Sequence, residues 1–129
     1  MPPRLTARQQ AELAILEPLP RRFERLHRLI EEMASLRADE TLQRQLTRNL
    51  DELKTLTGGI GLSALAETFG VMSMLARRSG GLQMRVRGLR EGLVSLKLNY
   101  DGALRAATTP VDGEEDETDA AGPGGTVSP

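Results

Sequence analysis

The chain of 129 residues contains no cysteine and a single histidine, His27. Without cysteine it cannot form a disulfide framework, a thiolate metal site or a cysteine nucleophile, and one histidine excludes multi-histidine metal sites. No stretch approaches the ~20 apolar residues that a membrane span requires, and the N-terminus lacks the apolar run of a signal peptide. These absences predict a soluble, cytoplasmic protein without a metal site.

Motifs of the common enzyme classes are also absent. There is no phosphate-binding loop followed by Lys-Ser or Lys-Thr, no Gly-x-Ser-x-Gly and no metal-binding histidine pair. The glycine cluster at 58–61 follows a helical pattern, whereas a phosphate-binding loop follows a strand. We therefore expect a protein that is not an enzyme and that uses no cofactor. His27 lies at the edge of an apolar stripe, and we interpret it as a partly buried structural residue.

Strand patterns are missing, because no segment alternates apolar and polar residues between turn signals. Apolar residues instead recur at spacings of three and four along four segments, which indicates amphipathic helices. The predicted fold class is all-α: an antiparallel four-helix bundle at 21–109, preceded by a lid helix and a Pro-rich turn at 1–20. The stripes expected to form the core are Phe23, Leu26, Ile30 and Met33; Leu42, Leu46, Leu50, Leu53 and Leu56; Leu65, Phe69, Met72 and Leu75 or Ala76; and Leu82, Val86, Leu89, Leu93, Leu96, Tyr100 and Ala103.

Several residues mark the predicted ends of the first helices. Thr6 and Gln9 have the spacing of a capping box, and the prolines at 18 and 20 are expected to stop the lid helix. Asp39 is a candidate N-cap of the second bundle helix.

The next turn is predicted from glycine and serine. Gly58 and Gly59 are expected to close the second bundle helix in the left-handed conformation. Ser63 is expected to cap the helix that follows.

Charge is distributed unevenly along the chain. Residues 1–110 carry 17 basic and 12 acidic side chains, a net charge of +5. Segment 110–129 is rich in Pro and Gly and almost free of large apolar residues, so burial cannot offset the entropy of ordering it. We expect a disordered acidic tail. It contains the other six of the 18 acidic residues: Asp112, Glu114, Glu115, Asp116, Glu117 and Asp119.

One spacing in the chain is similar to that of a known family. Leu53-Lys54 is followed, seven residues after the lysine, by Gly61 and then by an apolar helix with Leu65-Ala66 near its start. This arrangement resembles the histidine-containing phosphotransfer (HPt) domain, a four-helix bundle of bacterial phosphorelays. The expected helix order, with a short first and a long last helix, also suits that family over residues 6–107.

Two positions depart from the family pattern. The resemblance places the phospho-accepting histidine three residues before Lys54, where this chain has Asp51, and Thr55 replaces the glycine after the lysine. An aspartate cannot replace the imidazole as nucleophile without the metal and acidic cluster of a receiver domain, and none is visible. The resemblance therefore implies a pseudo-phosphotransfer adaptor or regulator in two-component signalling.

Helical geometry indicates which surface would bind a partner. On a helix with 3.6 residues per turn, the side of 44–58 opposite the leucine stripe carries basic groups around one carboxylate. Family members present this surface to receiver domains, so the resemblance implies a response-regulator receiver domain or a histidine kinase as partner. The predicted partner-binding residues are Arg44, Arg48, Asp51, Lys54, Thr55 and Gly58. Alternatively, this is an ordinary solvated surface on which Asp51 pairs with Lys54.

The last helix suggests a different function. A stripe of small or polar residues could accommodate the lid helix or a second subunit, because glycine in a helix costs ~1 kcal/mol that close packing can offset. The alternative function is therefore a structural or assembly module that homodimerises through the last helix, helped by Val71, Met74, Val94 and Leu98. The stripe consists of Gly88, Gly92, Ser95, Asn99 and Gly102.

A third function, nucleic-acid binding by the basic bundle with the acidic tail as an intramolecular competitor, is disfavoured. The chain has only three aromatic residues and no recognisable reading motif.

Overall fold

The computed structural model describes residues 4–36, 40–78 and 81–111. Every regular element in these ranges is an α-helix, so the all-α prediction is confirmed. None of the described helices combines the length and the apolar composition needed to cross a membrane. Asp39 and the segment after Val111 lie outside the described residues. The helices are α1 (Ala7–Leu16), α2 (Leu19–Leu36), α3 (Glu40–Gly59), α4 (Ser63–Arg77) and α5 (Leu82–Thr108).

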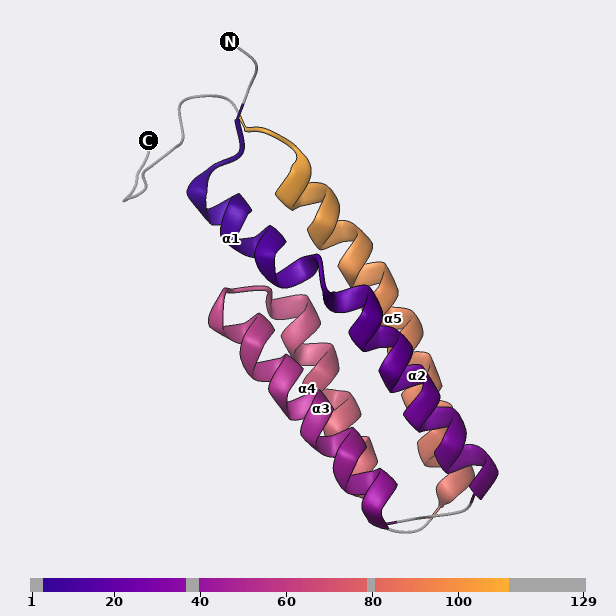
Figure 1. Cartoon of the computed structure of the whole chain (residues 1–129). Coiled ribbons are helices and arrows are strands. Elements are labelled where there is room, and N and C mark those ends of the chain that lie inside the picture. Colours follow the sequence, from indigo (N-terminus) through magenta and orange to yellow (C-terminus); the bar gives the residue numbers. More distant parts are fainter. Residues whose placement is uncertain (1–3, 37–39, 79–80, 112–129) are drawn as a thin grey trace.

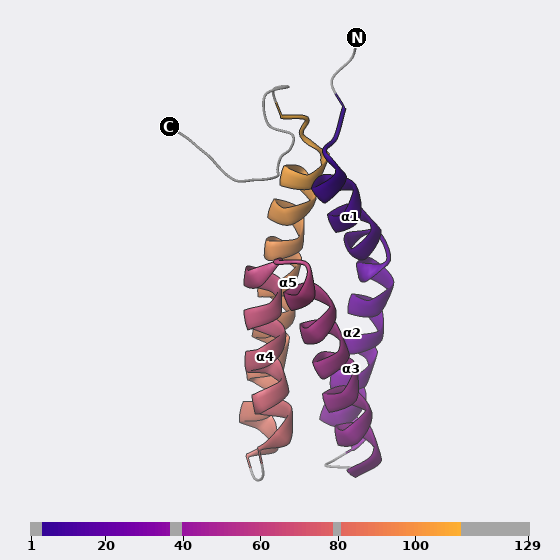
Figure 2. The same cartoon turned by 90° about the vertical axis from the view of Figure 1, so that its left-hand side faces the viewer.

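Four helices pack in a closed ring, and α1 lies beside it. α2 contacts both α3 and α5, and α4 also contacts α3 and α5 (Figure 1). The C-terminal part of α5 extends beyond the turn between α3 and α4, and α1 lies against this extension (Figure 2). The start of α1 and the end of α5 are therefore at one end of the molecule, and the end of α2 and the start of α3 are at the other.

The apolar stripes of α2 to α5 meet inside the ring, and Phe23 connects three of them. Its ring centroid lies 6.4 Å from that of Phe69 on α4 and 5.7 Å from that of Tyr100 on α5. The second pair is edge-to-face, an arrangement that contributes ~0.5–1.5 kcal/mol beyond the burial of apolar area. Phe23 therefore links α2 to two helices across the core.

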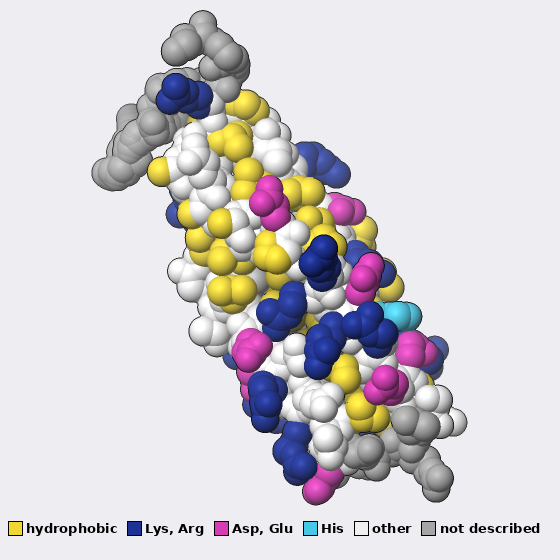
Figure 3. Space-filling view, viewed as in Figure 1, with side chains coloured by type: hydrophobic (Ala, Val, Ile, Leu, Met, Phe, Trp, Pro, Cys, Tyr) yellow, Lys and Arg dark blue, Asp and Glu magenta, His cyan; other side chains and the backbone are white. Residues whose placement is uncertain are grey.

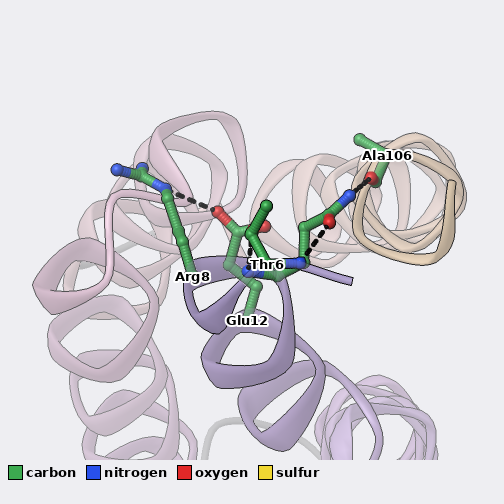
Figure 4. A network of polar contacts seen from close by, with 5 residues as sticks. Thr6, Arg8, Glu12 and Ala106 are labelled. Carbon is green, nitrogen blue, oxygen red and sulfur yellow. Dashed lines mark hydrogen bonds and ion pairs between the residues drawn. The ribbon is translucent and has the colours of Figure 1, made fainter. Parts of the chain in front are cut away.

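The predicted capping box at the start of α1 is confirmed, and it does more than cap the helix. Gln9 Oε1 accepts a hydrogen bond from the Thr6 amide (2.8 Å), and Thr6 Oγ1 accepts one from the Gln9 amide (3.0 Å). The other end of the Gln9 side chain donates to the Ala106 carbonyl oxygen of α5 (3.0 Å; Figure 4). It also donates to the Thr109 carbonyl oxygen just after α5 (2.7 Å). Gln9 thus caps α1 and fixes it to α5.

The turn between α1 and α2 is shorter than we predicted from the prolines at 18 and 20, because only two residues separate the two helices. Pro20 lies in the first turn of α2, where the missing backbone amide has no intrahelical partner to lose. Leu16 and Leu19 are buried on the two sides of the turn. The turn is therefore held against the core, and α2 begins two residues earlier than expected.

The stripe predicted for α3 is wrong at its last position. Leu56 is 42% exposed, whereas Thr57 is fully buried. Because four residues advance a helix by slightly more than one turn, Thr57 continues the buried row that includes Leu53. Leu56 precedes Thr57 by one residue and therefore points about 100° away from Thr57 around the helix axis. The Thr57 hydroxyl donates to the Leu53 carbonyl (2.7 Å), so its burial leaves no unpaired donor.

The turn between α3 and α4 uses a different glycine from the predicted pair. Gly58 and Gly59 lie inside α3, and Gly61 adopts the left-handed conformation with φ of 82°. The prediction for Ser63 is also wrong: it is the first residue of α4, and the N-cap is Leu62, which makes no side-chain capping bond. The helix continues further than expected because the left-handed residue is needed only where the backbone reverses.

Two of the small residues of α5, Gly88 and Gly92, are covered by side chains of α4. A Cβ atom built at Gly92 would lie 2.6 Å from Met72 Cγ, and one at Gly88 would lie 2.9 Å from Leu75 Cδ1. The two glycines therefore allow the side chains of α4 to approach the backbone of α5. This close packing offsets their low helix propensity.

Candidate protein-binding site

The six predicted partner-binding residues all lie on α3, but they divide into two groups. Arg44, Arg48 and Thr55 are exposed on the outer side of the helix. The other three face α4: Asp51, Lys54 and Gly58. The second group therefore takes part in packing between helices, which the sequence did not predict.

Asp51 is bound by two side chains that lie one turn apart on α4. The Ser73 hydroxyl donates a 2.6 Å hydrogen bond to Asp51 Oδ1, and Arg77 forms an ion pair with Oδ2. Ser73 is buried, whereas the side chains of Asp51 and Arg77 are 42% and 56% exposed. Because exposed ion pairs contribute only ~0–1 kcal/mol, the bond to the buried hydroxyl is the stronger link between the helices. Asp51 thus pairs with α4 rather than with Lys54.

Lys54 lies over a glycine of α4. A Cβ atom built at Gly70 would lie 3.4 Å from Lys54 Cε and 3.7 Å from its Nζ. The ammonium group forms no ion pair with any residue in the described ranges. The stem of Lys54 is therefore packed while its charge remains uncompensated, as is usual for a lysine at the edge of an apolar surface.

A group of arginines covers the outer side of α2 and α3. Arg48 has no ion pair with the described residues, and Arg44 is 3.7 Å from Glu40. Three further arginines on α2, at spacings of four and three, are exposed and unpaired within the same ranges. Figure 3 shows Lys and Arg side chains gathered over the middle of this side of the molecule. We call the surface formed by Arg21, Arg25, Arg28, Arg44 and Arg48 the basic face.

A neighbouring arginine holds the two helices of this face together. Arg22 Nη2 on α2 lies 3.1 Å from Glu52 Oε1 and 3.4 Å from Asn49 Oδ1 on α3. These contacts place Arg22 and Asn49 at the same level along the molecule. The charge of Arg22 is compensated by Glu52, so Arg22 is not counted in the basic face.

The chemistry that this site offers follows from its charged and hydroxyl groups. His27, which we expected to be partly buried, is exposed on α2. In the described part of the chain, no three His, Asp or Glu side chains are grouped so that they could hold a metal ion. Asp51 accepts bonds from Ser73 and Arg77, so both of its carboxylate oxygens are engaged by α4. The arrangement can present guanidinium, ammonium and hydroxyl groups to an acidic surface.

The sequence did not identify the α4 residues that complete this site. Ser73 and Arg77 have a spacing of four, which places them on one side of α4, but periodicity alone does not show which residue of α3 they meet. Gln43 was also missed: its side-chain amide donates to the Ala76 carbonyl (2.7 Å) and supplies a partner for the end of α4. The spacing of Ser73 and Arg77 thus indicates that they share a side of α4, whereas the packing of α3 on α4 decides that they meet Asp51.

No protein-family model matches this chain, and neither a curated protein nor a solved structure matches it significantly.

Proposed function

We propose that this protein is a non-catalytic adaptor or regulator, a pseudo-phosphotransfer domain that binds a receiver domain or histidine kinase of a bacterial signalling pathway. In this proposal the four helices of the ring form an antiparallel bundle and α1 is its lid. The observation that carries the proposal is the uncompensated positive charge of Arg48 and Lys54, on either side of Asp51, whose own charge is compensated by Arg77.

The charge pattern favours an acidic partner for a simple reason. Arg48 and Lys54 have no ion pair to give up within the described residues, so a partner carboxylate gains their attraction without breaking an existing bridge. The phosphorylation pocket of a receiver domain is acidic, which suits this surface. Asp51 is proposed to position α4 against α3 rather than to accept a phosphoryl group, because Ser73 and Arg77 already occupy its two oxygens.

The binding proposal is tested by calorimetric titration with receiver domains and kinase domains from the genome that encodes this chain. We expect binding that weakens with salt, because the Debye length falls from ~10 Å at 0.1 M to ~3 Å at 1 M. Arg48→Glu and Lys54→Glu should each reduce affinity about tenfold. Lys97→Glu on α5, also exposed and without an ion pair among the described residues, is the matched control. Failure of every such domain to bind would overturn the proposed partner.

The absence of catalysis is tested separately. Incubation with a phosphorylated receiver domain should leave no phosphate on this chain, since neither an activated imidazole nor a metal-bound carboxylate is proposed here. Phosphate found on His27 or Asp51 would overturn the non-catalytic part of the proposal.

A homodimeric structural module is the second candidate, and a different surface favours it. Val71 and Met74 on α4 and Val94 and Leu98 on α5 are 58–68% exposed. Exposed apolar groups that gather on one side commonly mark an interface. Light scattering across a wide concentration range tests this: a dimer that Leu98→Glu dissociates supports it, and a constant monomer mass contradicts it.

A further inference from the structure

We propose that the basic face is the docking surface for the acidic C-terminal segment of the same chain, residues 112–119. This docking needs only charges that the chain itself carries, so it does not depend on the external partner proposed above. If an acidic partner uses the same surface, the segment competes with it.

Charge complementarity is the first reason. The segment carries six carboxylates in eight residues. The basic face carries five arginines, and in the described ranges Arg44 has the only ion pair among them, a long contact of 3.7 Å. A single exposed ion pair contributes ~0.2–1 kcal/mol, so several pairs must form together to hold the segment on the basic face. Six carboxylates and five arginines are enough to form several pairs.

The opposite side of the molecule does not offer a comparable surface. A shallow groove between α4 and α5 is lined by Gly88 and Gly92 and by the carboxylates Glu67 and Glu91. The exposed residues beside it include Val71 and the other apolar groups of that side. A segment with six negative charges is repelled by the two glutamates and gains nothing from apolar neighbours.

The second reason is reach. The hydrogen bond from Gln9 to the Thr109 carbonyl (2.7 Å) places Thr109, three residues before the segment, beside α1. From Gln9 to Arg25 is 16 residues of helix and turn, or ~24 Å at 1.5 Å per residue. The ten residues from Thr109 to Asp119 extend to ~33 Å. The acidic residues can therefore lie along α2 as far as Arg25.

The arginines of α3 are within the same reach. Arg48 is adjacent to Asn49, which contacts Arg22 on α2, so Arg48 lies at the level of Arg22. That level is ~20 Å from Gln9 along α1 and α2. A tethered segment of this length has an effective concentration in the millimolar range, so contacts too weak to hold a free peptide are sufficient.

A spin label tests the docking directly. Because the chain has no cysteine, Ala120→Cys provides a single attachment site for a nitroxide immediately after the acidic residues. We expect the amide signals of Arg21, Arg25 and Arg48 to lose at least about half of their intensity relative to the reduced label, and to recover it when salt screens the charges. The signals of Val71 and Val94, on the other side, should be unchanged.

A charge-neutral segment is the matched control. Asp112, Asp116 and Asp119 are changed to Asn, and Glu114, Glu115 and Glu117 to Gln, which keeps the length of the segment and removes its charge. The amide signals of the basic face should then keep their full intensity in the presence of the nitroxide. The proposal is overturned if the neutral variant broadens the same signals equally, if both sides of the molecule are broadened alike, or if the effect is confined to Arg4 and Arg105 at the root of the segment.

Discussion

The hydroxyl of Ser73 donates a 2.6 Å hydrogen bond to Asp51 Oδ1 and so joins the middle of α3 to the C-terminal half of α4. Asp51 stands where the family resemblance places a phospho-accepting histidine. Its carboxylate is engaged within the chain, and the free positive charges lie around it at Arg48 and Lys54. The same α3 segment therefore contributes both to packing and to a charged surface, and the two roles can be separated by substitution.

Replacement of Asp51 should cost more stability than replacement of its ion-pair partner. Asp51→Ala leaves the buried Ser73 hydroxyl without its acceptor and should lower the free energy of unfolding by ~1–3 kcal/mol. Arg77→Ala removes only an exposed ion pair and should cost less than ~1 kcal/mol. Urea denaturation measures both, with Asp101→Ala, an exposed aspartate without an ion pair among the described residues, as the control. An equal or larger loss for Arg77→Ala would show that the ion pair is the stronger link.

Three glycines of α5 should respond differently to the same change. Gly92→Ala should destabilise the protein by ~1–3 kcal/mol, because the new methyl group overlaps Met72 Cγ, which is close to the backbone and cannot easily move. Gly88→Ala should cost less, since it meets only the end of the Leu75 side chain.

The matched control for these two is Gly102→Ala. No atom lies within 4 Å of a Cβ built at Gly102, so only the gain in helix propensity remains, ~0.5–1 kcal/mol. Thermal and urea unfolding of the three variants give the ranking. Stabilisation by Gly92→Ala would mean that α4 does not approach α5 as closely as described.

Gln9 should control the attachment of α1. Gln9→Ala removes both bonds to the end of α5 and the capping-box bond from the Thr6 amide, and each of these partly buried bonds contributes ~1 kcal/mol. Amide hydrogen exchange in α1 should become much faster, while exchange in α3 and α4 should change little. Gln10→Ala is the control, because the Gln10 side chain donates to the carbonyl of Leu5 in an exposed position. Unchanged protection of α1 would show that apolar packing alone holds it.

The pair formed by Glu31 and Arg90 should make a small part of the stability depend on pH. Arg90 donates bonds of 2.8 and 2.7 Å to the two carboxylate oxygens of Glu31, and these bonds hold the pKa of Glu31 below its ordinary value. A carboxyl group with a lowered pKa in the folded state stabilises the protein above its unfolded pKa and loses this effect as the pH falls through its folded pKa.

The comparison with Glu31→Gln isolates that effect. The difference in the free energy of unfolding between the two proteins should be constant near neutral pH and shrink as the pH falls below about 4.3. Glu24→Gln, which removes an exposed carboxylate without an ion pair among the described residues, is the control. A difference that persists unchanged at pH 3 would contradict the role of the charge.

The predictions from helical periodicity were correct for features that depend on the residues of a single helix. The capping box at Thr6 and Gln9 is confirmed because it depends on four consecutive residues. The stripes of α2 and α4 lie in the core as predicted, and so does the middle of the α5 stripe, whereas Leu82, Tyr100 and Ala103 are only partly buried against the core.

The errors have different causes. Leu56 is exposed because the buried row of α3 passes through Thr57 instead, and Gly58 and Gly59 lie inside α3 because the helix does not end at the first glycine. Ser63 was misplaced by one position, since the N-cap of α4 is Leu62. Glycine tolerates the left-handed conformation but does not require it.

By itself, the sequence determined that the described chain is helical and which side of each helix is apolar, because these follow from local propensity and a 3.6-residue repeat. The packing of the helices decided that Asp51 meets Ser73, that Met72 covers Gly92 and that Arg48 stays unpaired within the described residues. The physical reason is that such contacts depend on the rotation and axial position of one helix relative to another. Those two quantities come from the fit of side chains across the whole ring, which no single stretch of sequence contains.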